Sequence, residues 1–141
     1  MLTLEVVTPD GVVLLESDVQ AIVVRRRETA FDVGSEVAIL PDHAPMLVRL
    51  PIAPARFTKK GCTVYMSLCG GFVEVFHHRV TAVTPRCASV SPDEPDPVGA
   101  AWNLCERWRA QAGGSREEMV GVASQPTRGA RPPSGSPATS R

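Results

Sequence analysis

The side chains that could act as nucleophiles or proton carriers are few and widely separated in this sequence. Ser67 precedes a glycine pair but does not lie in the G-x-S-x-G turn that exposes a nucleophilic serine. His43 stands between two prolines, and the sequence identifies no second titratable group that would exchange a proton with it. We therefore predict no catalytic residue.

Metal and phosphate chemistry also lack their usual motifs. His77 and His78 are adjacent, so on a strand their side chains would point to opposite faces, and Cys87 lies too far along the chain for the spacing of zinc ligands. No G-x-x-x-x-G-K-[ST] or G-x-G-x-x-G segment is present to bind phosphates. We predict no metal site and no cofactor. Four cysteines, expected to be reduced thiols, are separated by 7, 18 and 18 positions: Cys62, Cys69, Cys87 and Cys105.

Composition narrows the class of protein further. The chain has 141 residues, 43% of them apolar, which suits one small domain with an appendage. Fifteen basic and fifteen acidic residues cancel, and the arginine run at 25–27 has no interleaved aromatic residues, so nucleic-acid binding is not expected. No apolar run approaches the ~20 residues needed to cross a bilayer, and we expect no signal peptide.

The elements that would carry these residues are strands up to about position 83. Leu2, Leu4 and Val6 alternate with polar residues, and Pro-Asp-Gly at 9–11 favours a tight turn and a return strand at 12–15. Turn signals at similar spacing predict about nine short strands in a sandwich or barrel. The prolines at 41, 45, 51 and 54 are expected to keep the neighbouring strands short.

The character of the sequence changes at 91–97, where three prolines and three acidic residues cannot continue a ladder. Asp96 is the expected N-cap of a helix that begins at Pro97 and stops at the glycine pair 113–114. A second helical fragment from Ser115 would be short, and the Ser/Pro/Gly-rich end is predicted to be disordered. The predicted organisation is a β domain at 1–90, a short helical region at 91–123 and a tail at 124–141.

Four segments carry a family resemblance. They are Leu-Thr-Leu-Glu-Val-Val-Thr-Pro at 2–9, Ile-Leu-Pro-Asp-His-Ala-Pro at 39–45, Gly-Gly-Phe-Val-Glu-Val at 70–75 and Arg-Val-Thr-Ala-Val at 79–83. In this order and separation they make residues 1 to about 90 resemble the epsilon subunit of a rotary F-type ATP synthase.

The resemblance implies a mainly β protein, an about ten-stranded β-sandwich at the foot of the central stalk, bound to the gamma subunit and resting on the membrane rotor ring. Such a subunit is not an enzyme. It couples the translocation of protons or sodium ions to ATP synthesis or hydrolysis in the catalytic head. Its implied location is peripheral, on the cytoplasmic face of the bacterial plasma (inner) membrane.

The resemblance also implies contact residues. Glu36 falls where the family presents a polar turn to the loops of the ring. The segment implied to pack on the gamma subunit consists of His43, Ala44, Pro45, Met46, Leu47 and Val48.

The C-terminal part departs from the family. Relatives have two antiparallel helices that can reach the catalytic alpha/beta head and inhibit ATP hydrolysis, whereas one helix and a fragment are expected here. Asp96 and Ala100 match an Asp-x-x-Arg-Ala motif that binds ATP in some relatives, but Gly99 replaces the arginine. We predict no useful ATP affinity.

Two other functions stay open from the sequence. One is a free-standing β-domain binding module, a diverged paralogue outside the synthase. The other, an enzyme with a dispersed active site, is least favoured because no nucleophile is paired with a base.

Overall fold

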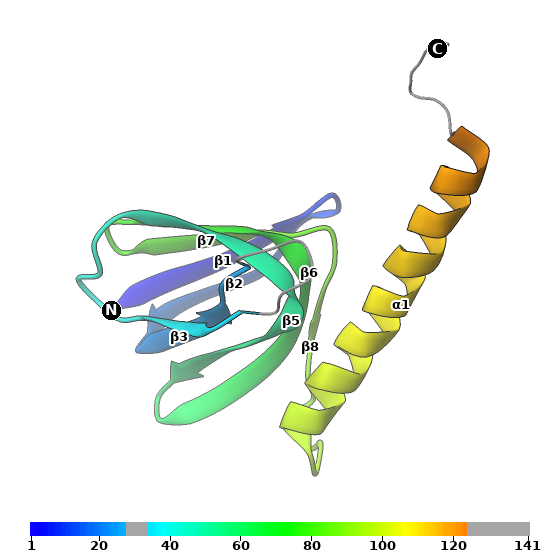
Figure 1. The fold of residues 1–141 in the computed structure, drawn as a ribbon. Helices are drawn as coiled ribbons and strands as arrows, with labels where there is room; N and C mark the ends of the chain where they lie inside the picture. Colours follow the sequence, from blue (N-terminus) through cyan, green and yellow to red (C-terminus); the bar gives the residue numbers. More distant parts are fainter. Residues whose placement is uncertain (28–33, 124–141) are drawn as a thin grey trace. The chain divides into compact units, whose positions relative to one another are not determined.

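The computed structural model describes residues 1–27 and 34–123, with side chains placed up to residue 112. The described residues form eight strands followed by one helix (Figure 1). The elements are β1 (Leu2–Thr8), β2 (Gly11–Val19), β3 (Ala21–Arg25), β4 (Glu36–Ile39), β5 (Met46–Lys59), β6 (Cys62–Phe76), β7 (Arg79–Val83), β8 (Cys87–Ser89) and α1 (Pro97–Ala123).

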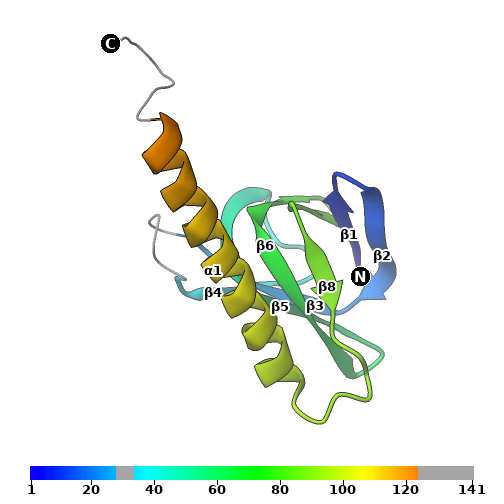
Figure 2. The same cartoon turned by 90° about the vertical axis from the view of Figure 1, so that its right-hand side faces the viewer.

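The strands form a continuous sheet in the order β2-β1-β7-β6-β5-β3-β4, and β8 pairs separately with β6. All neighbours are antiparallel except β1 and β7, which run parallel. The sheet folds over on itself because β5 and β6 are long enough to take part in two layers (Figures 1 and 2). One layer contains β2, β1, β7 and the adjoining halves of β6 and β5; the other contains β4, β3, β8 and the remaining halves.

The two long strands pass between the layers at Pro51 and at the glycine pair of β6. The register runs from Leu50 opposite Gly71 to Ile52 opposite Cys69, so the pairing is interrupted between these two pairs. Gly71 has a φ of 97°, and a Cβ there would collide with the carbonyl oxygen of Val83. Only glycine fits this crossing without strain.

The side-chain alternation changes phase at the crossing. Even-numbered residues such as Val48 and Leu50 are buried before it in β5, and odd-numbered residues such as Ala55 and Phe57 are buried after it. The same strand therefore faces the core in both layers, which a strand of unbroken period two would not do.

The core lies between the layers. Burying each aliphatic side chain contributes about 1.5–3 kcal/mol. The buried residues of this cluster are Leu2, Leu4, Val6, Val19, Ile22, Val24, Ile39, Leu50, Ala55, Phe57, Met66, Leu68, Val73, Val75, Val80 and Ala82.

Helix α1 begins as predicted and ends later than predicted. The Asp96 carboxylate accepts a hydrogen bond from the Gly99 N–H at 3.1 Å, which confirms the expected N-cap. The predicted stop at residues 113–114, and with it the separate fragment from Ser115, is wrong, because α1 continues to Ala123. A glycine inside a helix costs only about 1 kcal/mol, so a pair of glycines weakens a helix without ending it.

The chain divides into two compact units, Met1–Glu106 and the residues from Arg107 onward. The first unit therefore contains the strands and the first turns of α1. Among the described residues, α1 does not combine the length and apolar character of a membrane-spanning helix.

The mainly β class predicted from the sequence is confirmed, with eight strands among the described residues instead of nine or ten. The prediction that Pro51 and Pro54 keep strands short is wrong, because both lie inside β5. One of the about nine predicted strands, at 31–33, lies outside the described residues, and so does the tail predicted at 124–141.

Candidate functional site

The residues considered for chemistry make structural contacts. Ser67 is 1% exposed, and its hydroxyl donates a hydrogen bond to the Ala101 carbonyl oxygen at 2.8 Å. His43 Nδ1 lies 2.8 Å from the Ala44 carbonyl oxygen, and the His77 ring packs edge-on against Phe76. These contacts position turns and the helix.

Burial raises the pKa of the thiols of Cys69 and Cys87, which keeps both protonated near neutral pH. No group of three or more His, Cys, Asp or Glu side chains suited to a metal ion occurs in the described part of the chain. The outer surfaces of the sandwich are the remaining candidate site.

The outer side of the layer that contains β2, β1 and β7 is a broad surface that we call the bare face. The register aligns its outward side chains in rows that cross the strands. One row consists of Val12, Val7, Val83, Phe72 and Arg49. The neighbouring row consists of Leu15, Glu5, Thr81, Glu74 and Leu47.

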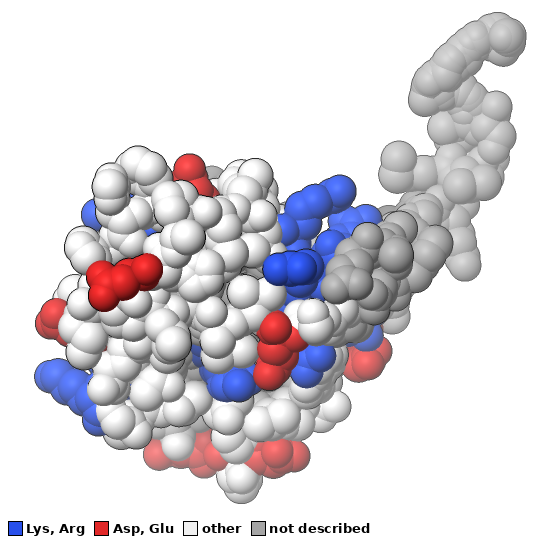
Figure 3. Space-filling view, turned by 60° about the vertical axis from the view of Figure 1, so that its left-hand side comes forward, with Lys and Arg blue, Asp and Glu red and all other residues white. Residues whose placement is uncertain are grey.

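Several large apolar side chains of the bare face are open to solvent. Leu47 is 67% exposed, Leu15 61%, Phe76 55%, Val12 54% and Phe72 42%. Single exposed apolar residues are ordinary, but a run of them across neighbouring strands indicates a contact surface for another protein. Figure 3 shows that much of the sandwich surface on the side drawn carries neither Lys or Arg nor Asp or Glu.

The outer side of the other layer, which we call the covered face, contacts the start of α1. Ser67 on β6 is bonded to Ala101, and the Arg25 guanidinium lies 5.4 Å from the centroid of the Trp102 ring. Figure 2 shows α1 beside β6 and β8 at this point. Ala101 and Cys105 are fully buried, so this part of the helix uses its small residues against the strands.

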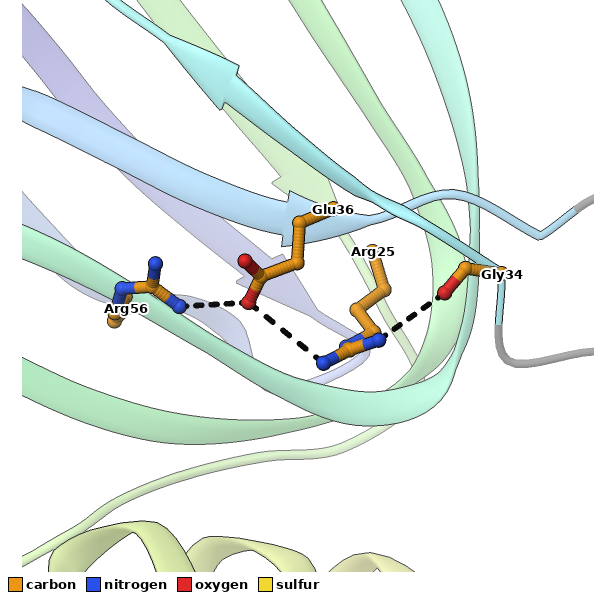
Figure 4. A network of polar contacts seen from close by, with 4 residues as sticks. All are labelled: Arg25, Gly34, Glu36 and Arg56. Carbon is orange, nitrogen blue, oxygen red and sulfur yellow. Dashed lines mark hydrogen bonds and ion pairs between the residues drawn. The ribbon is translucent and has the colours of Figure 1, made fainter.

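Three charged side chains form a network at one side of the covered face (Figure 4). Glu36 Oε2 accepts a hydrogen bond from Arg56 Nη1 at 2.8 Å and lies 3.7 Å from Arg25 Nη2. Arg25 also donates to the Gly34 carbonyl oxygen at 3.2 Å. The hydrogen bond from Arg56, opposed by a smaller effect of burial, lowers the pKa of Glu36, so this carboxylate stays ionised and paired.

The predicted contact residues differ in their exposure and in the face on which they lie. Glu36 is exposed and belongs to the network on the covered face. Of the segment predicted to meet the gamma subunit, Ala44, Pro45 and Leu47 are exposed, and His43 and Met46 are half-buried.

Val48 is 4% exposed and points into the sandwich. It holds β5 in place without forming part of the outer surface.

Sequence reasoning did not identify the rows of the bare face. Val12 and Phe72 are far apart in the chain, and the pairing of β2 with β1, of β1 with β7 and of β7 with β6 brings them into one row. The alternation within β1 predicted which of its side chains are buried. It did not predict which residues of other strands lie beside its outward side chains. The contact of Trp102 with Arg25 also depends on the fold.

A β-sandwich with large apolar side chains exposed across several neighbouring strands is typical of a subunit that docks in an assembly. Comparison with known proteins agrees with this class. Residues 1–89 match the ATP synthase, Delta/Epsilon chain, beta-sandwich domain family. The chain belongs to this family.

Curated relatives are similar over most of their length. The ATP synthase epsilon chain of Anoxybacillus flavithermus is 36% identical over 76% of this chain and 74% of the relative. The ATP synthase epsilon chain of Desulfitobacterium hafniense is 32% identical over 79% of this chain and 80% of its own.

Solved structures share the fold at low identity. A chain of the Euglena gracilis mitochondrial ATP synthase has a TM-score of 0.56 and 19% identity, covering 73% of this chain and 62% of that one. A chain from the central stalk/c-ring structure of the Tetrahymena thermophila mitochondrial ATP synthase has a TM-score of 0.51 and 14% identity, covering 88% of this chain and 96% of its own.

Proposed function

We propose that this chain is the epsilon subunit of an F-type ATP synthase, a non-catalytic part of the rotating central stalk. It couples translocation of protons or sodium ions through the membrane rotor to ATP synthesis or hydrolysis in the catalytic head. The family match over residues 1–89 carries this proposal. A part that transmits torque needs a stiff body, and two layers packed over one core supply it.

The bare face is the proposed contact with the gamma subunit. Leu47, the most exposed of its apolar side chains, lies in the segment that the sequence assigned to this partner. Ala44 and Pro45 precede it at the same end of the sandwich. Covering this surface would remove its apolar side chains from water, which is the main source of affinity in a lasting interface.

Glu36 is the proposed contact with the membrane rotor ring. Both of its ion pairs use Oε2, so Oε1 is the oxygen that would accept a hydrogen bond from a loop of the ring. The paired arginines keep the carboxylate ionised for that role, because they lower its pKa. The subunit would thereby sit peripherally on the cytoplasmic face of the bacterial inner membrane.

Helix α1 is the proposed route to the catalytic alpha/beta head. We propose that the helix contacts the head without binding ATP, because Gly99 stands where ATP-binding relatives have arginine. A side chain at Gly99 would collide with the Asp96 carboxylate, which is occupied in capping the helix. Titration with ATP should give no binding in the micromolar range; saturation there would contradict this part of the proposal.

The free-standing module is the less favoured alternative, since the relatives that match over most of their length are epsilon chains. The experiment that separates the two is association with the cognate gamma subunit. Leu47→Asp should weaken association by roughly 10- to 100-fold, because it loses about 1.5–3 kcal/mol of apolar burial.

Val98→Asp is the matched control, because Val98 is an exposed apolar residue in the first turn of α1, away from the bare face. It should bind like the wild type. A wild-type chain that fails to associate with the gamma subunit would end the proposal.

A further inference from the structure

Some charged side chains of the bare face form ion pairs with each other and others do not. Arg79 Nη1 donates to Glu5 Oε1 at 3.2 Å, and these residues stand in adjacent rows on neighbouring strands. Arg49 and Glu74 are related in the same way, since Arg49 is opposite Phe72 and Glu74 is opposite Leu47. Yet neither has an ion-pair partner among the described residues.

Arg49 occupies the end of the apolar row. Its neighbour in that row is Phe72, followed by Val83, Val7 and Val12. The Arg27 N–H donates to the Arg49 carbonyl oxygen at 2.8 Å, so the backbone at this end is held from the side. The guanidinium is thus the charged end of an otherwise uncharged stripe.

Glu74 lies in the row beside it, next to Leu47. An exposed carboxylate and an exposed guanidinium stand one row apart and are unpaired within the described part. They give the bare face one positive and one negative position, which a partner can meet in only one orientation. A partner that covers the apolar row would leave both charges partly desolvated unless it supplied groups of opposite sign.

We propose that the stalk partner covering the bare face presents a carboxylate to Arg49 and a cation to Glu74, and that these two pairs fix its orientation. The inference rests on the proposed function and specifies the chemistry of the partner at that surface. Apolar contact supplies most of the affinity, whereas the two charges select one docking direction.

The test uses the full chain and its cognate gamma subunit, with dissociation constants measured at two ionic strengths. Arg49→Glu should weaken binding about 10-fold or more, because it places like charges together at the interface. Glu74→Lys should weaken binding for the same reason. Both losses should shrink between about 0.05 M and about 0.5 M salt, where screening is stronger.

Lys60→Glu is the matched control, because it makes the same change of charge at an exposed turn between β5 and β6. It should bind like the wild type. Thermal unfolding of each variant checks that the fold is kept, and Arg49→Gln gives a second reading in which only the attraction is lost and a smaller effect is expected.

The outcomes distinguish the charge inference from the proposed function. Equal binding by the wild type, Arg49→Glu and Lys60→Glu would overturn the charge inference and leave the proposed function standing. Loss of binding to phosphatidylglycerol vesicles by Arg49→Glu, with binding to the gamma subunit unchanged, would also overturn it in favour of a lipid headgroup. Failure of the wild type to bind the gamma subunit would overturn both.

Discussion

The two outer faces of the sandwich share the long strands β5 and β6, but the chain treats them differently. On the covered face, Ser67 and Arg25 contact the first turns of α1, and Glu36 is paired with two arginines. On the bare face, Leu47 and Phe72 are exposed. The chain itself contacts much of the covered face, whereas the apolar side chains of the bare face are left for a partner.

This difference follows from the crossing of β5 and β6 between the layers. Because the alternation changes phase there, both halves of each strand bury one side in the core and present the other outward. The two faces then differ only in which side chains the sequence places outside and in whether α1 reaches them. Breaking the crossing should therefore remove both faces together.

The largest expected effect comes from Gly71→Ala. Its φ is 97°, and a Cβ would collide with the carbonyl oxygen of Val83, so β6 could not pair with β7 as it does. The free energy of unfolding, measured by urea titration, should fall by about 3 kcal/mol or more.

Gly61→Ala is the control for the glycine conformation alone. Gly61 also has positive φ, at 76°, but its Cβ would meet no atom within 4 Å. It should lose only about 1 kcal/mol. Equal losses for the two variants would show that the crossing at Gly71 is not the tight point that we describe.

The strands and the start of α1 could be predicted from the sequence, but the crossing could not. The runs of β-branched residues and the turn at 9–11 were enough for a mainly β domain, and Asp96 was enough for the start of α1. Pro51 was expected to keep its strand short, because proline disfavours a regular ladder. In the fold Pro51 lies opposite Gly70, where one break in the pairing lets both strands bend and continue.

The second-largest loss of stability is expected for Ser67→Ala. The hydroxyl is buried and bonded to Ala101, so its loss should cost about 1 kcal/mol of stability. Since the contact lies on the covered face, association with the gamma subunit should stay unchanged. Ser89→Ala, an exposed serine on the adjacent strand, should change neither quantity.

A loss of gamma binding in Ser67→Ala would mean that the two faces are not independent. In that case the contact of α1 with the strands would also shape the bare face. Stability and binding should therefore be measured on the same preparations.

The candidate site was predictable only where it is local in sequence. Residues 43–48 were assigned by their motif, and Leu47 is indeed exposed, but Val48 in the same motif is buried. Val12 and Phe72 carried no local signal, because an outward side chain gains its meaning from neighbours on other strands. Arg49 and Glu74 were likewise ordinary strand residues until the register placed them in adjacent rows.

The smallest effect concerns the charge network of the covered face. Glu36→Gln keeps the shape of the side chain and an oxygen that accepts from Arg56, but removes the ionic attraction. The side chain of Glu36 is 43% exposed, so solvent screens this attraction. The loss of stability at neutral pH should be no more than about 0.5 kcal/mol.

The contribution of Glu36 to stability should depend on pH in one direction. The pKa of Glu36 is lowered in the folded chain, chiefly by the hydrogen bond from Arg56, so the stabilisation is complete above the pKa of an unfolded glutamate and is lost as pH falls through the folded value. The wild type and Glu36→Gln should therefore differ at pH 7 and converge between about pH 5 and about pH 3. Glu74→Gln on the bare face removes a carboxylate with no ion pair in the described part, so at pH 7 its free energy of unfolding should equal that of the wild type. If Glu74→Gln lost as much stability at pH 7 as Glu36→Gln does, the contrast between the paired Glu36 and the unpaired Glu74 would be wrong.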